Sequence, residues 1–250
     1  INQSIYGETG FGAPRFVHGI PAEPNMSERL QAFFAKHPGG TYTEFIQQLE
    51  SEMTEAVRAG CVLQKFFVDG FLVQPDRETA LQDFRKLRHG ETIPSDSPLF
   101  CIIWHDKLEL CAKLGLVAAV HTGVWGDISR LSPVPLFSVV EQHPDTVFDV
   151  YHMGMPFVRE CAFLGKNYPN VYLNLCWSHC VSECISCQAI NEWLDLMPVN
   201  KIFGFGGDVI TLPEQIWGQL EHARQNLCHA LTSRILRERM DLEYARFILK

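Results

Sequence analysis

The chain has 250 residues, 46% of them hydrophobic, which is enough to bury one core of the size of an α/β barrel. Its net charge of −8 argues against nucleic acid as a partner, because phosphate binding needs a basic surface. No apolar stretch reaches the roughly 18 residues that span a bilayer, and no signal-peptide pattern opens the chain, so we expect no membrane partner and a cytoplasmic location. The nine cysteines, an odd number, favour reduced thiols over a disulfide framework.

The first half of the chain alternates between strand-like and helix-like segments. Phe45, Leu49 and Met53 recur at the spacing of one helix face. Asp76 stands where a helix N-cap is expected, and His105 with Asp106 is expected to cap another helix. We expect strands over 15–20 and 61–68, and helices over 27–36, 41–59, 76–88 and 98–114.

The second half repeats a strand followed by a helix. Short apolar runs rich in Val, Ile, Phe and Leu indicate buried parallel strands. We expect strands over 115–121, 146–152, 171–177 and 201–207, helices over 135–143, 155–165 and 182–196, and one or two long amphipathic helices from 213 onward. Strands that alternate with crossover helices predict an α/β fold of the (β/α)8 TIM-barrel type, as a single domain over 1–250. With six strand units in place of eight, we expect that barrel to be incomplete.

Three polar residues each close one of these apolar runs: His121 in GLVAAVH, His152 in TVFDVYH and Asp208 in KIFGFGGD. In a barrel of this type the C-terminal strand ends converge on the face where catalytic groups gather. Each histidine is a metal ligand or a satisfied core histidine, and Asp208 is a carboxylate ligand or a helix cap. Together they predict a metal site in which His152 or Asp208 takes a proton from metal-bound water.

Other residues beside the strand ends are candidates for the wall of a pocket. Trp125, Trp177 and His179 lie beside the ends of predicted strands, and binding sites are largely apolar with a few polar groups. Ordinary packing explains them equally well.

The motifs VHTG, YHMG, NLCW and FGFGGD, in this order, resemble the second half of the amidohydrolase superfamily. The similarity covers residues 14–250 and is greatest to the branch that includes aminocarboxymuconate-semialdehyde decarboxylase and related metal-dependent hydrolases. The resemblance implies that His121 and Asp208 bind a divalent metal, zinc or alternatively manganese, and that His152 supports metal binding or proton transfer. It further implies that Lys65, at the end of the strand over 61–68, bridges two metals after carboxylation; a surface or ion-paired lysine is the alternative.

The family also places a His-x-His pair at the end of its first strand, and this sequence contains none. We therefore expect either that the first strand lies outside this chain or that the metal site is degenerate. The first case implies a metal-dependent hydrolase that acts on a small carboxylated or cyclic substrate, or alternatively a non-oxidative decarboxylase. The second implies a non-catalytic barrel scaffold. A small molecule is the expected partner, and a homo-oligomer is compatible with the sequence.

A cysteine cluster supports a further alternative. Cys180, Cys184 and Cys187 form C-x3-C-x2-C beside Cys176, a spacing that resembles the iron–sulfur motif of radical SAM enzymes. The same spacing is one face of a helix, on which cysteine packs as a small hydrophobe. The helix interpretation is favoured, because the radical SAM family carries its motif after the first strand.

Overall fold

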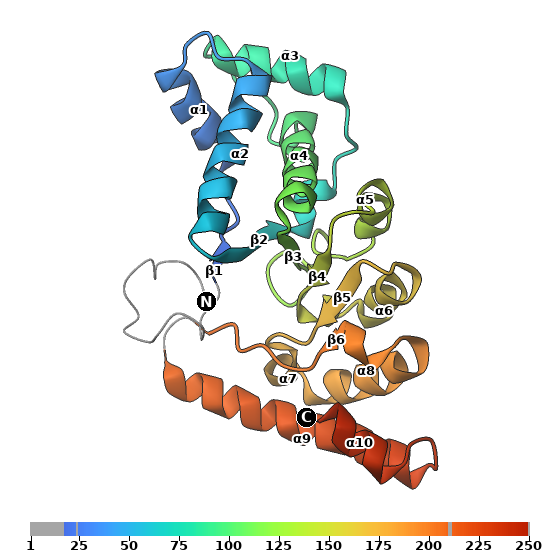
Figure 1. The fold of residues 1–250 in the computed structure, drawn as a ribbon. Helices are drawn as coiled ribbons and strands as arrows, with labels where there is room; N and C mark the ends of the chain where they lie inside the picture. The colour runs from blue at the N-terminus through green and yellow to red at the C-terminus, as the bar shows by residue number, and fades with distance from the viewer. Residues whose placement is uncertain (1–17, 24, 210–211, 250) are drawn as a thin grey trace. The chain divides into compact units, whose positions relative to one another are not determined.

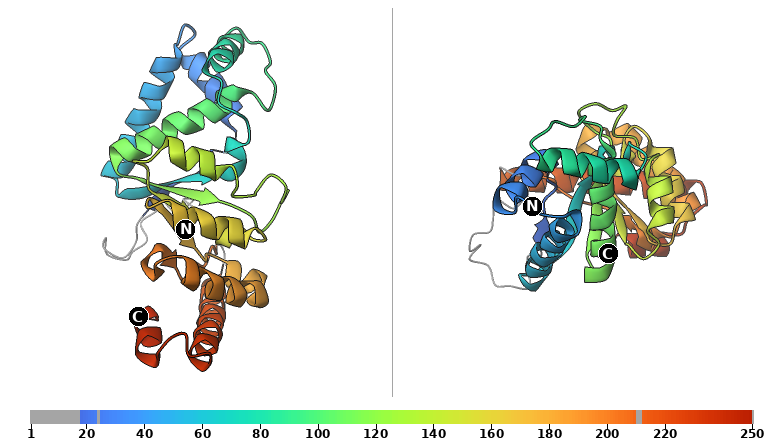
Figure 2. Two further views of the ribbon diagram at one scale, coloured as in Figure 1. Left: turned by 90° about the vertical axis from the view of Figure 1, so that its right-hand side faces the viewer. Right: turned by 90° about the horizontal axis from the view of Figure 1, so that it is seen from above.

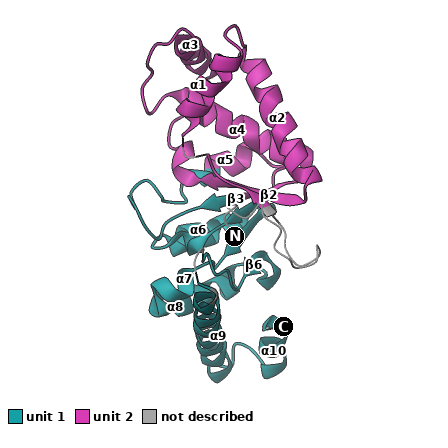
Figure 3. Cartoon of the chain, turned by 90° about the vertical axis from the view of Figure 1, so that its left-hand side faces the viewer, with its two compact units in different colours: residues 1, 120–137, 148–250 teal, residues 2–119, 138–147 magenta. Residues whose placement is uncertain are grey.

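The computed structural model describes residues 18–23, 25–209 and 212–249. It has an α/β fold whose six strands follow chain order in the sheet, β1-β2-β3-β4-β5-β6 (Figure 1). The pairs β1–β2, β4–β5 and β5–β6 are parallel. Within the described ranges β1 and β6 are the two edges, so the sheet is open, as expected for an incomplete barrel. The chain forms two compact units: an N-terminal unit, which contains described residues of 18–119 and 138–147, and a C-terminal unit, which contains those of 120–137 and 148–249 (Figure 3).

The elements of the N-terminal unit match the expected segments closely. They are β1 (His18–Ile20), α1 (Met26–Lys36), α2 (Tyr42–Arg58), β2 (Cys61–Phe67), the 3₁₀ turn η2 (Val68–Phe71), α3 (Arg77–Arg88) and α4 (Pro98–Leu114). Side-chain caps explain their starts. Thr41 and Glu44 form a capping box at α2, and Asp76 accepts hydrogen bonds from two backbone N–H groups of α3, as predicted.

An aromatic cluster forms the core under α1, α2 and α3. The rings of Phe33 and Phe45 meet edge to face, as do those of Phe34 and Phe84. The expectation that His105 and Asp106 cap a helix is wrong, because α4 begins at Pro98 with Ser97 as its cap, and both residues lie in its middle. His105 is buried there, and its Nδ1 lies 2.8 Å from Nε2 of His143.

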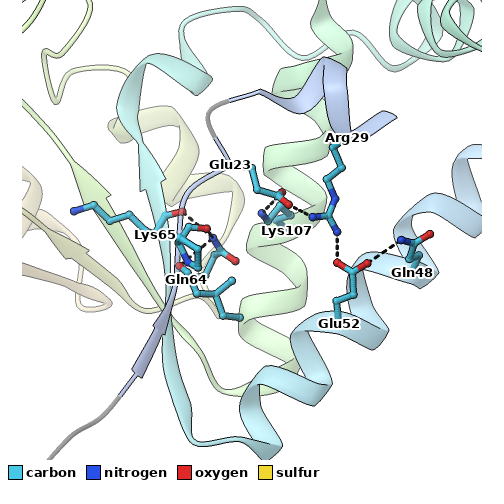
Figure 4. A network of polar contacts seen from close by, with 9 residues as sticks. Glu23, Arg29, Gln48, Glu52, Gln64, Lys65 and Lys107 are labelled. Carbon is cyan, nitrogen blue, oxygen red and sulfur yellow. Dashed lines mark hydrogen bonds and ion pairs between the residues drawn. The ribbon is translucent and has the colours of Figure 1, made fainter. Parts of the chain in front are cut away.

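A polar network lies between β1, α1, α2 and α4 (Figure 4). Lys107 of α4 is buried and its Nζ lies 3.0 Å from Glu23 Oε2. Glu23 compensates the charge of Lys107 where it is removed from water. Arg29 of α1 pairs with both Glu23 and Glu52, so two cations face two carboxylates in this network. In the same view the half-buried side chain of Lys65 points away from this network.

The C-terminal unit contains the strand ends that the sequence singles out. β3 (Val117–His121) runs into it, and α5 (Leu136–Gln142) lies across the boundary of the two units. Its other elements are β4 (Phe148–Val150), the 3₁₀ turn η3 (His152–Gly154), α6 (Val158–Asn167), β5 (Val171–Asn174), α7 (Ser178–Val181), α8 (Glu183–Leu196), the 3₁₀ turn η4 (Val199–Lys201), β6 (Ile202–Phe203), α9 (Pro213–Leu236) and α10 (Leu242–Ile248). Helix α8 packs along α9 (Figure 2).

The strands of this unit are shorter than predicted. Pairing in β4, β5 and β6 ends at Val150, Asn174 and Phe203, before the candidate site residues. His121 is the last residue of β3, whereas His152, Trp177 and Asp208 lie in the turns that leave the sheet. Over the described part of the chain, no helix combines the length and the apolar composition needed to cross a membrane.

Candidate metal centre

Left-handed backbone conformations gather where the chain leaves these strands. Among described residues other than glycine, six have a positive φ, and five of them follow β3, β4, β5 or β6. These five are Val124 (61°), His152 (66°), Met153 (57°), Trp177 (59°) and Asp208 (47°). Such a conformation costs about 1–3 kcal/mol for a residue with a side chain, and it concentrates at functional sites. The candidate residues His152, Trp177 and Asp208 are thus held in strained turns.

His152 lies at the centre of the arrangement. It is fully buried, and its Nδ1 lies 2.8 Å from the backbone carbonyl oxygen of Cys176. Because a carbonyl oxygen can only accept, Nδ1 carries the hydrogen, and in the neutral ring Nε2 keeps its lone pair. That Nε2 lies 3.0 Å from Nδ1 of His121 and 3.8 Å from Oδ2 of Asp208. The two predicted ligands therefore both approach the lone pair of His152.

The ends of β3 and β4 are held together by their backbones. Tyr151 N–H donates to Val120 O over 2.9 Å, and the hydroxyl of Thr122 donates to Tyr151 O over 2.7 Å. Gly123 adopts φ +60, and a Cβ there would lie 1.9 Å from the carbonyl oxygen of Met155. Glycine at 123 therefore permits the close approach that brings His121 beside His152.

Asp208 reaches the histidines from the loop after β6. Trp177 N–H donates to Gly206 O over 2.8 Å, and Nε2 of His179 donates to Gly204 O over 2.9 Å. The Asp208 side chain is 49% exposed, whereas His152 is fully buried. The carboxylate thus stands between solvent and the buried imidazoles, a position that suits a proton acceptor.

Cys176 is a member of the centre that the sequence did not predict. A ring nitrogen of His152, Sγ of Cys176 and a carboxylate oxygen of Asp208 all lie within 4.8 Å of one another. Among the described residues this is the one such group of three or more His, Cys, Asp or Glu side chains. The position of Cys176 in NLCW, at a strand end like the other three motifs, was the available signal. It was obscured by the cysteines that follow.

Those following cysteines do not form a metal site in the described structure. Cys180 and Cys184 are exposed, Cys187 is half-buried, and none of them belongs to a group of converging ligands. Cys184 and Cys187 lie on α8, whereas Cys180 lies on α7. The interpretation of one packed helix face is therefore correct only for the helical position of Cys184 and Cys187, and Cys184 is exposed. All nine cysteines lie within the described ranges and are free thiols, as expected.

The aromatic residues predicted to line a pocket lie against the histidines. The ring centroid of Trp125 is 6.4 Å from that of His121, and the centroid of Trp177 is 6.3 Å from that of His152. Trp177 and Asp208 also line an open cavity of about 400 Å³, a size that suits a small molecule. Helix α9 forms another wall of this cavity, through Gln215, Gly218, Gln219 and His222.

His179 is placed differently from the two tryptophans. It is buried, its Nε2 is bonded to Gly204 O, and its Nδ1 lies 3.3 Å from Nδ2 of Asn226 on α9. Burial lowers the pKa of His179, so the ring is neutral and both nitrogens are used in internal hydrogen bonds. This geometry favours a role in holding the Asp208 loop; a role in the pocket remains a prediction.

His152, Cys176 and Asp208 fit a divalent cation, because their donor atoms all lie within 4.8 Å of one another. His121 approaches His152 but is not a member of that group. The ligands of a tetrahedral zinc ion lie about 3.3–3.7 Å apart, as follows from bond lengths of about 2.0–2.3 Å. The separations of 3.0 Å between His121 Nδ1 and His152 Nε2 and of 3.8 Å between His152 Nε2 and Asp208 Oδ2 lie on either side of that range. Lys65 belongs to β2 of the N-terminal unit, and its role as a metal bridge remains a prediction.

Comparison with known proteins agrees with this fold. Protein fluG of Emericella nidulans is 32% identical over 224 residues, an alignment that covers 81% of this chain and 25% of fluG. The chain thus spans a quarter of the length of that relative.

Three solved structures, all under 20% identical, share the fold. A protein assigned as a metal-dependent hydrolase, from Lactobacillus casei, aligns with a TM-score of 0.69 and 16% identity over 93% of this chain and 61% of its own. Glucuronate isomerase from Caulobacter crescentus aligns with a TM-score of 0.70 and 18% identity over 91% of this chain and 53% of its own. Uronate isomerase from Thermotoga maritima aligns with a TM-score of 0.71 and 14% identity over 91% of this chain and 56% of its own. The amidohydrolase family model matches residues 9–240, and the chain belongs to that family.

Proposed function

We propose that the chain carries the metal centre of a hydrolase that attacks a small carboxylated or cyclic substrate with metal-activated water. The observation that supports this most directly is the convergence of His121, His152 and Asp208 from three separate strand ends, with Nε2 of His152 within 3.8 Å of both partners. Membership of the amidohydrolase family and the fold shared with a protein assigned as a metal-dependent hydrolase agree with it.

The roles of the residues follow from their burial and hydrogen bonds. His121 and Asp208 would hold the cation together with His152, whose Nδ1–H is fixed on the Cys176 carbonyl so that Nε2 faces the ligands. A bound divalent ion supplies a water molecule of lowered pKa. Asp208, the exposed member, would accept a proton at its carboxylate and return it to the leaving group. Proton transfer by His152 is the alternative role, and its contact with His121 would carry it.

The pocket that adjoins Asp208 would receive the substrate. Trp177, whose ring Trp125 contacts edge to face, provides an apolar wall. The amides of Gln215 and Gln219 on α9 provide hydrogen-bonding groups. A decarboxylase would use the same centre, so the products of the reaction decide between water addition and release of carbon dioxide.

The first test is the metal content of the purified protein, measured by elemental mass spectrometry in the wild type and in Asp208→Asn. We expect about one divalent metal ion per chain in the wild type and a loss of at least about tenfold in occupancy in the variant. Asparagine tolerates the left-handed conformation of residue 208, so the fold should be kept. Asp145→Asn, which changes an exposed aspartate in the same way, is the matched control and should keep the metal.

The second test is activity. Loaded protein is assayed with lactones, esters and amides that carry a carboxylate, and with aromatic carboxylic acids for release of carbon dioxide. Turnover that a chelator abolishes and added metal restores supports the proposal. Full-length protein that binds no metal and turns over none of these compounds would favour the non-catalytic scaffold.

A further inference from the structure

Cys176 occupies a position in the centre that neither packing nor the predicted ligand set explains. Its side chain is buried and its Sγ lies within 4.8 Å of donor atoms of His152 and Asp208. Four other cysteines, Cys61, Cys101, Cys111 and Cys161, are also buried. In the part of the chain that the structure describes, none of those four belongs to a group of converging His, Asp or Glu side chains. Cys176 therefore differs from them in its surroundings, which are polar and ligand-rich.

The backbone of Cys176 is held on both sides. Its N–H donates to Oδ1 of Asn174 over 3.0 Å, and Nδ2 of Asn174 donates to Oδ2 of the buried Asp149 over 3.0 Å. Its carbonyl oxygen accepts from His152 Nδ1 over 2.8 Å. The residue that sets the tautomer of His152 thus also carries the thiol, so the backbone from which Sγ projects is held beside the imidazole.

The loop that carries Asp208 leaves room for the thiol. A Cβ at Gly206 would lie 2.9 Å from both Cβ and Sγ of Cys176, closer than real Cβ contacts. Glycine at 206 therefore allows the loop to pass directly over the sulfur, two residues before the carboxylate. The hydrogen bond from Trp177 N–H to Gly206 O fixes that approach.

We infer that Cys176 is a thiolate ligand of the metal ion, which makes the centre a zinc site with mixed nitrogen, sulfur and oxygen ligands. This inference rests on the proposed function, and it names a ligand and a metal identity that the function alone leaves open. Binding breaks the Sγ–H bond and releases the proton to solvent, since the thiolate is the ligand form.

The chemistry of the donors favours zinc. Thiolate is a soft ligand that selects zinc over manganese or magnesium, whereas imidazole and carboxylate alone discriminate less. A catalytic zinc usually has three protein ligands and an open position for water. His152, Cys176 and Asp208, whose donor atoms all lie within 4.8 Å of one another, supply these three, so Cys176 takes the ligand position that the proposed function gives to His121. The exposed side of Asp208 leaves an approach for water.

Cobalt(II) tests this directly, because a thiolate ligand gives a charge-transfer band in the near ultraviolet that nitrogen and oxygen ligands do not give. Metal-free full-chain protein is titrated with Co²⁺ alone and the absorption spectrum is recorded for the wild type, Cys176→Ala and Cys180→Ser. We expect the band in the wild type and its loss in Cys176→Ala. Cys180 is an exposed thiol that lines the cavity beside Asp208, so Cys180→Ser is the matched control and should keep the band. The dissociation constant of the alanine variant should rise at least about tenfold.

The outcomes separate this inference from the proposed function. If the wild type binds one Co²⁺ without a thiolate band, and Asp208→Asn no longer binds the ion, the role of Cys176 would be overturned and the proposed metal centre would stand. A band that survives in Cys176→Ala but disappears in Cys180→Ser would assign the thiolate ligand to Cys180 and overturn this inference. Absence of any Co²⁺ binding would overturn both. X-ray absorption of the zinc-loaded wild type, which shows a sulfur neighbour of the metal or shows none, decides the question without any variant.

Discussion

Gly123 and Gly126, both with a positive φ, differ in what a methyl group would meet. At Gly123 a Cβ would lie 1.9 Å from the backbone oxygen of Met155, whereas at Gly126 the nearest atom is a flexible side-chain carbon of Leu131 at 3.7 Å. Alanine at either position pays for the left-handed conformation, about 1 kcal/mol, but only at 123 must backbone also move.

We therefore expect Gly126→Ala to lower the free energy of unfolding by about 1 kcal/mol and to keep metal affinity. Gly123→Ala should lower it by at least about 3 kcal/mol and weaken metal binding as well, because it separates the ends of β3 and β4 that hold His121 and His152. Urea unfolding and metal titration of both variants measure the two effects. Equal losses in the two variants would show that the approach of Gly123 to Met155 is not needed.

At the residue scale the sequence predicted which side chains converge, but not the backbone conformation of the turns that carry them. His121, His152 and Asp208 could be found because each closes an apolar run, and parallel strands bring their ends together. The left-handed turn at Trp177 could not be found, since tryptophan rarely adopts that conformation. Histidine and aspartate adopt it more often, but nothing local required it at His152 or Asp208. Cys176 closes the run in NLCW as the other site residues close theirs, but Cys180, Cys184 and Cys187 made it look like part of a cysteine cluster.

Helix boundaries were predictable to within a few residues because local signals set them. Asp76 caps α3 and Pro98 begins α4 as the sequence indicates, and α8 and α9 begin within a residue of their expected starts. The four-residue helix α7 was not expected, since its sequence has no periodicity that separates it from α8. Contacts between elements carry no such local signal, as the buried histidine pair shows.

That pair joins α4 to the turn after α5. His105 Nδ1 and His143 Nε2 lie 2.8 Å apart with the ring of Phe71 edge-on to His105, and neither ring is more than 8% exposed. Burial lowers the pKa of both, that of His143 to about 4, whereas an unfolded histidine titrates near 6.5. Asp106, beside His105, opposes this shift only in part.

Stability should therefore depend on pH through these groups. Because the unfolded chain binds protons near pH 6.5 and the folded chain only near pH 4, the free energy of unfolding should fall as pH drops through that interval, by on the order of 3 kcal/mol for His143. Urea unfolding at about pH 7 and pH 5 measures it, and His143→Gln should flatten the dependence. His229→Gln, which changes an exposed histidine, should leave the slope as in the wild type.

Two arginines of α9 allow a matched test of whether hydrogen bonds to α8 hold α9 in place. Arg234 is 8% exposed and donates to Asn191 O over 2.9 Å and to Asp195 Oδ1 over 2.6 Å, both on α8. Arg224 pairs with Glu221 of its own helix at the surface.

Arg234→Met should lower the free energy of unfolding by about 2 kcal/mol, the worth of a buried charge-assisted hydrogen bond. Arg224→Met should change it by about 0.5 kcal/mol or less, since an exposed pair contributes little. Thermal and urea unfolding of the two variants make the comparison. If Arg224→Met proved as harmful as Arg234→Met, the attachment of α9 would not depend on its bonds to α8.

On the scale of the whole molecule, neither compact unit is a continuous stretch of chain. The boundary falls after Ala119, after Phe137 and after Val147, so it divides β3 and α5 within single elements. A strand or helix forms its hydrogen bonds cooperatively, and loss of one half destabilises the other. We therefore predict that the two units unfold together, as the sequence-based expectation of one domain over 1–250 requires.

Pulsed hydrogen exchange at increasing urea concentration tests this, with peptides from α4 reporting the N-terminal unit and peptides from α6 and β5 reporting the C-terminal unit. We expect the same urea midpoint for both units.

Zinc at about 100 times its dissociation constant should then raise the unfolding free energy by about 2.7 kcal/mol. His121, His152 and Asp208 all lie in one unit, but because the units are coupled, zinc should move both midpoints equally. Asp208→Asn should abolish the shift in both sets of peptides. A shift confined to α6 and β5 would mean that the metal centre belongs to an independently folding half of the chain, and the prediction of a single domain would be wrong.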